Sequence, residues 1–255
     1  MTPSFRVDGK VAVVTGAGRG LGRAFALGLA EAGARVVVAE YNVRTGRETA
    51  QLIGSDGALF VQTDVADPDS VASLADAIEG AYGQLDIIVN NAALDGAPDA
   101  TLLMDLDPEV YDRVMAVNVK GMWLMVKALV PLLRRSGGGS VVNAGSTGAF
   151  LSFPGQLPYC TSKNAVFGVT KTLARELGRD HIRVNCLCPG PTNTESARRH
   201  IADKAVLDQL IASQCLPEQQ EPEDLVGPLL FLVSDASRFV TGQALISDGG
   251  IVMLP

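Results

Sequence analysis

The sequence contains few histidines, cysteines and aromatic residues, and these shortages argue against several classes of site. Its two histidines are His181 and His200, and aromatic residues make up 5% of the chain. Of its four cysteines, Cys186 and Cys188 are one residue apart, which is the wrong spacing for a zinc knuckle. We expect these two to be small buried apolar side chains. The sequence therefore predicts no metal site.

Positive charge and long apolar runs are also scarce. The formal net charge is −7, and Arg198-Arg199-His200 is the nearest approach to a basic cluster. Because nucleic-acid surfaces need clustered Lys and Arg, we expect no nucleic-acid partner. The longest strongly apolar stretch, Leu225 to Val233, is about half a membrane span and contains Gly227 and Pro228. Residues 1–10 lack the apolar core of a signal sequence, so we expect no membrane association and a cytoplasmic protein.

What the sequence does contain is a regular alternation of apolar strands and helical patterns along 255 residues, with no linker or break in composition. We predict strands at residues 10–14, 35–39, 58–62, 85–89, 140–144, 182–187 and 244–247. Helical patterns cover residues 21–32, 67–82, 108–133, 156–177, 194–214 and 223–233, the second of them with Asp67 as N-cap. Uninterrupted apolar strands indicate a sheet covered on both faces. The sequence predicts a single α/β domain over residues 1–255, a doubly wound, seven-stranded parallel sheet of the Rossmann type with helices on both faces.

A glycine-rich segment, Thr15 to Gly22, joins the first strand to the first helix. Ligands of doubly wound sheets bind at the carboxyl ends of the strands, which is where this segment lies. Gly16, Gly20 and Gly22 permit a tight turn and a close approach of the backbone to a pyrophosphate. The helix that begins near Leu21 offers free amides to the phosphates. We therefore predict a dinucleotide site here, with Arg19 beside it.

Glu40 ends the second strand, about twenty residues beyond the glycines. A carboxylate at this place accepts hydrogen bonds from the adenosine ribose hydroxyls and repels a 2′-phosphate. Arg19 argues the other way, since a guanidinium attracts that phosphate. Because Glu40 occupies the position that touches the ribose, we expect NAD rather than NADP.

Tyr159 and Lys163 are four residues apart within a predicted helix, so their side chains share one face. Their ordinary pKa values are ~10 and ~10.4, and neither group is a good base at neutral pH. A neighbouring ammonium favours the phenolate, so we predict that Lys163 lowers the pKa of Tyr159 enough for proton transfer with an alcohol or a carbonyl. The spacing alone is common in helices, and this interpretation depends on the rest of the site.

Four further motifs have the spacing of a known family. They are Asn90-Asn91-Ala92 after the fourth strand, Asn118 within a helix, Ser146 thirteen positions before Tyr159, and Pro189-Gly190-Pro191-Thr192-Asn193-Thr194 after the sixth strand. With the glycine loop, they make the sequence resemble the short-chain dehydrogenase/reductase family from Lys10 to Gly250. It departs from the usual pattern at Ala93, Gly145 and Glu40, where glycine, serine and aspartate are more frequent.

The resemblance implies a role for each of these residues. Tyr159 is the acid/base, Lys163 lowers its pKa and binds the nicotinamide ribose, and Ser146 polarises the carbonyl. Asn118 holds a water that links Lys163 to solvent. The other residues expected to contact the cofactor are Asn90, Ala92, Pro189, Gly190, Thr192 and Thr194, with a threonine of this loop holding the nicotinamide amide. Asp64 and Val65 are expected to flank the adenine.

The function expected from these residues and the resemblance is hydride transfer between NAD(H) and a secondary alcohol or ketone. Two alternatives remain open. One is an NADPH-dependent 3-oxoacyl (carrier protein) reductase, and the other is a non-catalytic dinucleotide-binding sensor. A sensor has no need for the serine, tyrosine and lysine together, and all three are present.

The substrate pocket is expected to be lined by residues 94–99, residues 148–157 and the segment after Pro191. Its apolar side chains suggest a neutral or lipophilic substrate, while Asp95, Gln156 and Glu195 add polar groups. The polar segment at about 193–214 is predicted to be a lid that is more mobile than the core. In the family, helices corresponding to residues 108–133 and 156–177 form subunit interfaces, so the resemblance implies a homotetramer.

Overall fold

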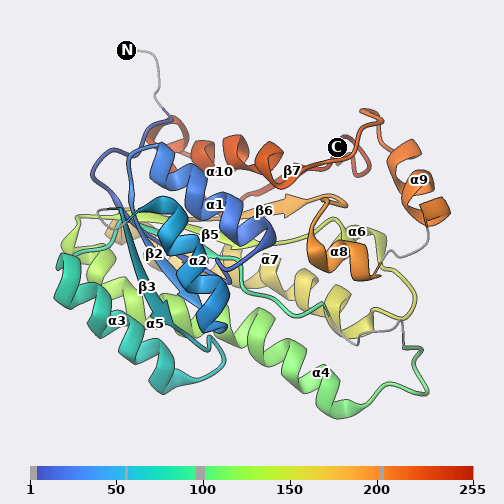
Figure 1. The fold of residues 1–255 in the computed structure, drawn as a ribbon, viewed down its shortest axis with the longest axis horizontal. Helices are drawn as coiled ribbons and strands as arrows, with labels where there is room; N and C mark the ends of the chain where they lie inside the picture. The colour runs from blue at the N-terminus through green and yellow to red at the C-terminus, as the bar shows by residue number, and fades with distance from the viewer. Residues whose placement is uncertain (1–4, 55–56, 96–100, 201–203, 255) are drawn as a thin grey trace.

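The computed structural model describes residues 5–54, 57–95, 101–200 and 204–254 of the chain. Its centre is a seven-stranded sheet in which all neighbouring strands are parallel (Figure 1). The spatial order is β3-β2-β1-β4-β5-β6-β7, so the doubly wound sheet predicted from the sequence is confirmed. The strands are β1 (Val11–Thr15), β2 (Arg35–Glu40), β3 (Ala58–Gln62), β4 (Ile87–Asn90), β5 (Gly139–Ala144), β6 (Ile182–Pro189) and β7 (Ala244–Ser247).

Helices alternate with the strands along the chain. In the described residues they are α1 (Gly20–Glu31), α2 (Val43–Ile53), α3 (Pro68–Tyr82), α4 (Pro108–Met115), α5 (Gly121–Arg135), α6 (Gly148–Leu151), α7 (Leu157–Leu177), α8 (Glu195–His200), α9 (Lys204–Ala212) and α10 (Val226–Val233). Short 3₁₀ turns occupy Gly178–Asp180, Pro222–Leu225 and Asp235–Ser237. The predicted N-cap of α3 is confirmed, because the Asp67 carboxylate accepts a hydrogen bond from Asp69 N at 3.0 Å.

The two faces of the sheet are covered by different helices because successive side chains of a strand alternate. Val11 and Val13 of β1 face a core that is shared with α3, α5 and α7. Ala12 and Val14 face the opposite core, which is shared with α1, α2 and α10. Figure 1 shows α1 and α10 on one side of the sheet, with α3 and α5 on the other.

The helical pattern at 108–133 is interrupted in the structure. α4 ends at Met115, a π-helical turn occupies Ala116–Lys120, and α5 begins at Gly121. Such turns leave the regular helical hydrogen-bond ladder and are frequent at functional sites. The whole run, Pro108–Arg135, is long and apolar enough to span a bilayer, but 56% of its most apolar window is buried inside the protein. Its apolar side is therefore largely used in packing.

Three other segments differ from the sequence prediction. The predicted helix at 194–214 is two helices, α8 and α9, and residues 201–203 of the expected lid lie outside the described residues. The predicted helix at 223–233 begins with a 3₁₀ turn. Helix α2 was not predicted, although Asn42 caps it by accepting hydrogen bonds from Arg44 N at 3.1 Å and Thr45 N at 3.2 Å.

Candidate active site

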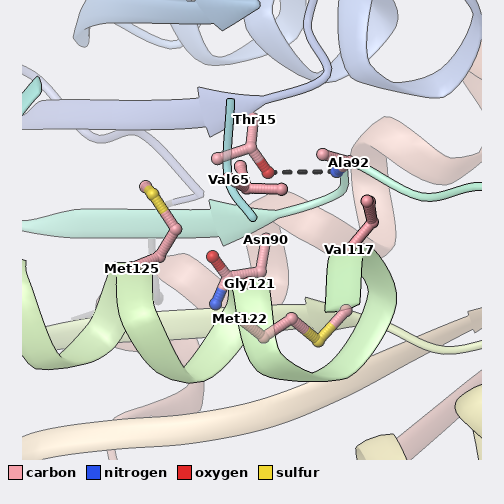
Figure 2. Close-up of a pocket in the computed structure, with 8 residues that line it drawn as sticks. All are labelled: Thr15, Val65, Asn90, Ala92, Val117, Gly121, Met122 and Met125. Atoms are coloured by element: carbon pink, nitrogen blue, oxygen red, sulfur yellow. Dashed lines mark hydrogen bonds between the residues drawn. The ribbon is translucent and has the colours of Figure 1, made fainter. Parts of the chain in front are cut away.

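The glycine loop lies against the loop that follows β4. Gly16 has a φ of 63°, and a Cβ at this position would lie 2.9 Å from Ala92 Cα. The Thr15 hydroxyl oxygen accepts a hydrogen bond from Asn91 N at 2.9 Å. It also accepts one from Ala92 N at 3.0 Å (Figure 2). A Cβ on Gly22 would clash with the Gly16 carbonyl oxygen. Glycine is thus required at these positions by contacts that hold the two loops together.

The first turn of α1 has the properties of a phosphate-binding helix end. Its N-cap, Arg19, is extended and makes no side-chain capping bond, and the turn contains no acidic residue. Gly20 has a φ of 51°, and Thr194 faces it, since a Cβ on Gly20 would lie 3.4 Å from Thr194 Cγ2. Free amides at a helix start attract anions. This cradle fits the pyrophosphate of a dinucleotide, with Leu21 in the same turn.

Glu40 supports the glycine loop directly from the end of β2. One carboxylate oxygen accepts a hydrogen bond from Gly18 N at 2.8 Å, and the other accepts one from Asn42 N at 2.9 Å. Arg19, the residue predicted to favour a 2′-phosphate, lies 3.5 Å from the Glu195 carboxylate in an exposed ion pair. The negative charge of Glu40 therefore lies next to the glycine loop, while the Arg19 guanidinium lies next to Glu195 of α8.

The predicted catalytic residues Ser146, Tyr159 and Lys163 are brought together where β5 and α7 meet. Ser146 follows β5, and its hydroxyl accepts a hydrogen bond from Gly148 N at 3.0 Å. A Cβ on Gly148 would lie 3.3 Å from Ser146 Oγ and 3.4 Å from Tyr159 Cε1, so the hydroxyl and the tyrosine ring are neighbours. Lys163 is buried one turn beyond Tyr159, and its ammonium donates a hydrogen bond to the Ala144 carbonyl at 2.8 Å. The lysine nitrogen is 5.6 Å from the centre of the tyrosine ring.

The electrostatics of this group differ from the prediction made for the isolated pair. Burial raises the pKa of Tyr159, the Ser146 hydrogen bond partly opposes the rise, and the Asp95 carboxylate adds to it. Burial lowers the pKa of Lys163, and the charges of Cys186 and Asp95 oppose that shift. The expectation that Lys163 lowers the pKa of Tyr159 in this arrangement was wrong, because desolvation of the phenol outweighs other effects and the ammonium is bonded to the Ala144 carbonyl.

Asn118 lies fully buried in the π-helical turn. Its amide exchanges two hydrogen bonds with the Leu94 backbone, accepting from the N–H and donating to the carbonyl, each at 2.8 Å. The amide nitrogen also donates to Ser162 Oγ at 3.0 Å, and that hydroxyl donates to the Tyr159 carbonyl at 2.7 Å. Asn118 therefore joins the loop after β4 to the helix that carries the tyrosine and the lysine.

The other residues predicted to bind the cofactor differ in their surroundings. Asn90 is buried and donates to Asn143 Oδ1 at 2.9 Å, which joins β4 to β5. Thr192 is also buried, and its hydroxyl lies 3.0 Å from Gln220 Oε1. Thr194 accepts a hydrogen bond from Ala197 N at 3.1 Å and so caps α8. The hydrogen bonds of these side chains thus hold the ends of β4 and β5 and the loop after β6 in place.

Pro189 and Gly190 place the loop after β6 beside the end of β7. A Cβ on Gly190 would lie 2.8 Å from Asp248 Cα, so the backbones pack closely there. Asp64 and Val65, the residues expected to flank the adenine, lie in the loop after β3. Asp64 accepts a hydrogen bond from Ala66 N at 2.9 Å. Val65 is buried against Gly121, with 3.0 Å between its Cγ2 and a Cβ at that glycine.

A narrow crevice with no room for a water molecule lies behind the loop that follows β4 (Figure 2). Figure 2 shows the Asn90 amide directed toward Gly121 and Met122 of α5. Its oxygen is buried and has no hydrogen-bond partner among the described residues. The crevice is lined by Thr15, Val65, Asn90, Ala92, Val117, Gly121, Met122 and Met125. It is far too small for a dinucleotide, so this crevice is not the cofactor site.

Sequence reasoning missed several side chains that hold the site together. Thr15 accepts hydrogen bonds from two backbone amides of the loop after β4, and Asn143 accepts one from Asn90. Ser162 accepts one from Asn118 and so connects it to α7. Ser162 lies between Tyr159 and Lys163 in the sequence, and this position was the available signal. Residues 96–99 of the expected substrate pocket lie outside the described residues.

Comparison with known proteins decides the family. A family model described as enoyl-(acyl carrier protein) reductase matches residues 16–252. A short-chain dehydrogenase/reductase of Aspergillus oryzae is 38% identical over 257 residues, covering 98% of this chain and 97% of the relative. The chain belongs to the short-chain dehydrogenase/reductase family. It is therefore an enzyme of an oxidoreductase family whose members use NAD(P)(H).

Other members of the short-chain dehydrogenase/reductase family differ in substrate and cofactor. A probable galactose dehydrogenase of Rhizobium meliloti is 37% identical over 243 residues, covering 94% of this chain and 93% of the relative. A gluconate 5-dehydrogenase of Burkholderia cenocepacia in complex with NADP and tartrate has a TM-score of 0.90 and 34% identity, covering 97% of this chain and 96% of that one. A 3-ketoacyl-(acyl-carrier-protein) reductase of Brucella melitensis complexed with NADH has a TM-score of 0.89 and 32% identity, covering 97% of this chain and 99% of that one.

Proposed function

We propose that this protein is an NAD-dependent dehydrogenase that interconverts a neutral secondary alcohol and its ketone. The observation that carries the proposal is the position of the Ser146 hydroxyl beside the Tyr159 ring, with Lys163 one turn away. A binding protein without catalysis gains nothing from this arrangement. The nicotinamide, when bound, supplies the hydride acceptor or donor.

The side chains divide the proton chemistry among them. Ser146 offers a hydroxyl to the substrate oxygen and holds it beside the Tyr159 phenol, so the phenol accepts the alcohol proton or donates one to the carbonyl. The raised pKa keeps the phenol protonated at neutral pH, which favours ketone reduction there. Lys163 lies 5.6 Å from the centre of the ring, and an oxidised nicotinamide, when bound, would add a positive charge that favours the phenolate.

The preference for NAD is argued from charge at the end of β2. Glu40 is held by Gly18 N and Asn42 N, so its carboxylate cannot easily swing away from the cofactor loop. A 2′-phosphate placed against it would be repelled by on the order of a few kcal/mol at surface-like dielectric. Arg19 is the nearby cation of the loop, but it pairs with Glu195. It would therefore offset only part of the repulsion between Glu40 and a 2′-phosphate.

The substrate surface near the tyrosine combines apolar and polar groups. Phe153 lies close to the catalytic pair, since a Cβ on Gly148 would be 3.4 Å from the Tyr159 ring and 3.9 Å from the Phe153 ring. Leu151, Phe153 and Leu157 are all exposed around it. An apolar substituent can pack against Phe153 while the carbinol meets Ser146, which supports a neutral substrate.

The test is a panel of secondary alcohols and ketones assayed by nicotinamide absorbance with NAD(H) and NADP(H). We expect turnover with a kcat/KM at least tenfold higher for NAD(H). Tyr159→Phe should bind the cofactor and lose at least a hundredfold in kcat. Undiminished activity in that variant would refute the proposed chemistry, and a tenfold preference for NADP(H) would refute the proposed cofactor.

A second candidate is an NADPH-dependent 3-oxoacyl (carrier protein) reductase. The Brucella melitensis 3-ketoacyl reductase, with its TM-score of 0.89, favours the acyl substrate, although that structure holds NADH. The description of the matching family model names another acyl carrier protein substrate, the enoyl group. The two candidates are distinguished by adding a 3-oxoacyl thioester to the same panel. A kcat/KM for the thioester above that of every simple ketone would favour the reductase.

The assembly is proposed to be a homotetramer that uses α4, α5 and α7. Trp123 on α5 is 46% exposed, although most large apolar side chains of that helix are buried. An exposed aromatic residue on a long helix is suited to a subunit interface. Light scattering at micromolar concentration tests this, and a monomer would contradict it.

A further inference from the structure

Asp95 is held beside the catalytic helix by a continuous set of hydrogen bonds. Its neighbour Leu94 is fixed on both backbone groups by the Asn118 amide, each at 2.8 Å. That amide bonds Ser162 at 3.0 Å, and Ser162 bonds the Tyr159 carbonyl at 2.7 Å. The position of Asp95 is thereby tied to the residue that transfers the proton.

The Asp95 carboxylate also contacts the helix that covers the site. Ser196 in the first turn of α8 donates a hydrogen bond to Asp95 Oδ2. The residue is only partly buried, and no hydrogen bond to its second oxygen is found within the described ranges. One carboxylate oxygen is thus bonded to the first turn of α8.

The charge of Asp95 reaches the reaction centre. It acts on both Tyr159 and Lys163, raising the pKa of each. None of the ion pairs between described residues includes the Asp95 carboxylate, although the charge of Lys163 acts on it from the catalytic helix. An anionic group placed next to Asp95 would therefore be repelled by the carboxylate.

We propose that Asp95 selects the substrate by charge, accepting a hydrogen bond from a hydroxyl or ammonium group next to the carbinol and rejecting a carboxylate, sulfonate or phosphate there. This inference rests on the proposed dehydrogenase function and narrows its substrate class to polyols, sugars and amino alcohols. A polar site that hydrogen-bonds a substituent discriminates strongly against analogues that cannot supply the donor.

Four alcohols that share one carbinol test the proposal. Butan-2-ol, propane-1,2-diol, 1-aminopropan-2-ol and lactate all present a methyl carbinol, and they differ in the group beside it. At neutral pH we expect the wild type to have at least tenfold higher kcat/KM for the diol and the amino alcohol than for butan-2-ol. We expect lactate to fall at least tenfold below butan-2-ol. If only larger alcohols are turned over, the same four compounds are compared as competitive inhibitors.

Two variants separate charge from geometry. Asp95→Asn keeps an oxygen for Ser196 and removes the charge, so it should raise the ratio of lactate to amino alcohol at least a hundredfold. Ser196→Ala removes the hydrogen bond and keeps the charge, so it should leave that ratio within about threefold of the wild type. Ratios unchanged by Asp95→Asn, or a wild type that prefers lactate, would overturn the proposal.

A second readout is independent of which alcohol is used. Besides Asp95, the groups that face Tyr159 are Ser146, Lys163, Cys160 and Cys188. Removing the Asp95 charge should move the pH profile of kcat/KM to lower pH, and an unmoved profile would contradict the inference. A protein that oxidises no alcohol in the wider panel instead contradicts the proposed function, and this inference with it.

Discussion

Gly145 packs directly against Cys186 on the neighbouring strand. A Cβ at Gly145 would lie 2.6 Å from Cys186 Sγ and 2.7 Å from Cys188 Sγ. The two sulfur atoms are 3.5 Å apart and buried, and they lie behind the residue that precedes the catalytic serine. The glycine, which departs from the usual family pattern, is explained by the two thiols that occupy the space of a side chain.

Replacing Gly145 by a larger residue should therefore destabilise the protein, and the size of the loss should depend on whether the two cysteines are present. Gly145→Ser should lower the free energy of unfolding by about 1–3 kcal/mol, because well-packed interiors tolerate added atoms poorly. In the background of Cys186→Ala and Cys188→Ala, the same change should cost less than about 0.5 kcal/mol. Urea unfolding of the four proteins gives the coupling. Additive losses would show that the sulfurs are not the obstacle.

Asn118 should be more important for stability than an exposed asparagine on the catalytic helix. Asn118→Ala leaves the Leu94 N–H and carbonyl without their partners, and we expect a loss on the order of 3 kcal/mol together with reduced kcat. Asn164 also donates two hydrogen bonds, to Ala149 O at 2.8 Å and Cys160 O at 3.0 Å, but it is exposed. Asn164→Ala should cost less than about 1 kcal/mol in the same thermal or urea unfolding experiment. Equal losses would contradict the role assigned to Asn118.

The glycine loop can be tested against a glycine that has no such constraint. Gly22→Ala places a methyl group on the Gly16 carbonyl, so we expect weaker NAD binding, by at least tenfold, and a lower melting temperature. Gly80 lies inside α3, and a Cβ built there would have open space around it, so Gly80→Ala should stabilise the protein by up to about 1 kcal/mol. Cofactor titration by fluorescence and thermal unfolding check both. Tight NAD binding by Gly22→Ala would contradict the packing argument.

The fold was accessible from the sequence because its local signals agree with one another. The apolar strands, the cap at Asp67 and the glycine turn all specify alternating elements, and the parallel order follows from them. The helix α2 was missed although the sequence contains its signals, since Asn42 is a favourable N-cap residue and the segment that follows it is amphipathic with few apolar residues. The π-helical turn at Asn118 was missed because tertiary hydrogen bonds to Leu94 stabilise it, and no periodicity in the sequence records them.

The sequence predicted which residues make up the candidate site, but it did not predict the directions of their pKa shifts. Ser146, Tyr159 and Lys163 meet as their spacing predicted. The direction of the tyrosine pKa shift did not follow from spacing, since it depends on how deeply the phenol is buried and on the charge of Asp95. The burial of the phenol and the proximity of Asp95 depend on the tertiary structure, so the spacing of residues in the sequence does not reveal them.

The cofactor preference should change when the charge at the end of β2 is removed. Glu40→Gln keeps a carbonyl oxygen for one of the two loop amides and abolishes the repulsion of a 2′-phosphate. We expect the ratio of kcat/KM for NADP to that for NAD to rise at least tenfold. Glu31→Gln, at the exposed end of α1, is the matched control and should leave the ratio unchanged. A ratio unaffected by Glu40→Gln would mean that another residue reads the ribose.

The pH dependence of catalysis should carry the signature of a buried phenol. Burial raises the pKa of Tyr159, so the phenolate needed for alcohol oxidation becomes populated only as the pH rises, and kcat/KM for oxidation should increase toward alkaline pH. Ketone reduction uses the protonated phenol, so its rate should stay high at neutral pH and fall as the pH passes the same value. Tyr159→Phe should remove this dependence along with the activity. Tyr82 also has a pKa raised by burial, but it lies at the end of α3, and Tyr82→Phe should leave both profiles in place. Profiles that change with Tyr82→Phe, or oxidation that slows as the pH rises, would show that Tyr159 is not the group that exchanges the proton.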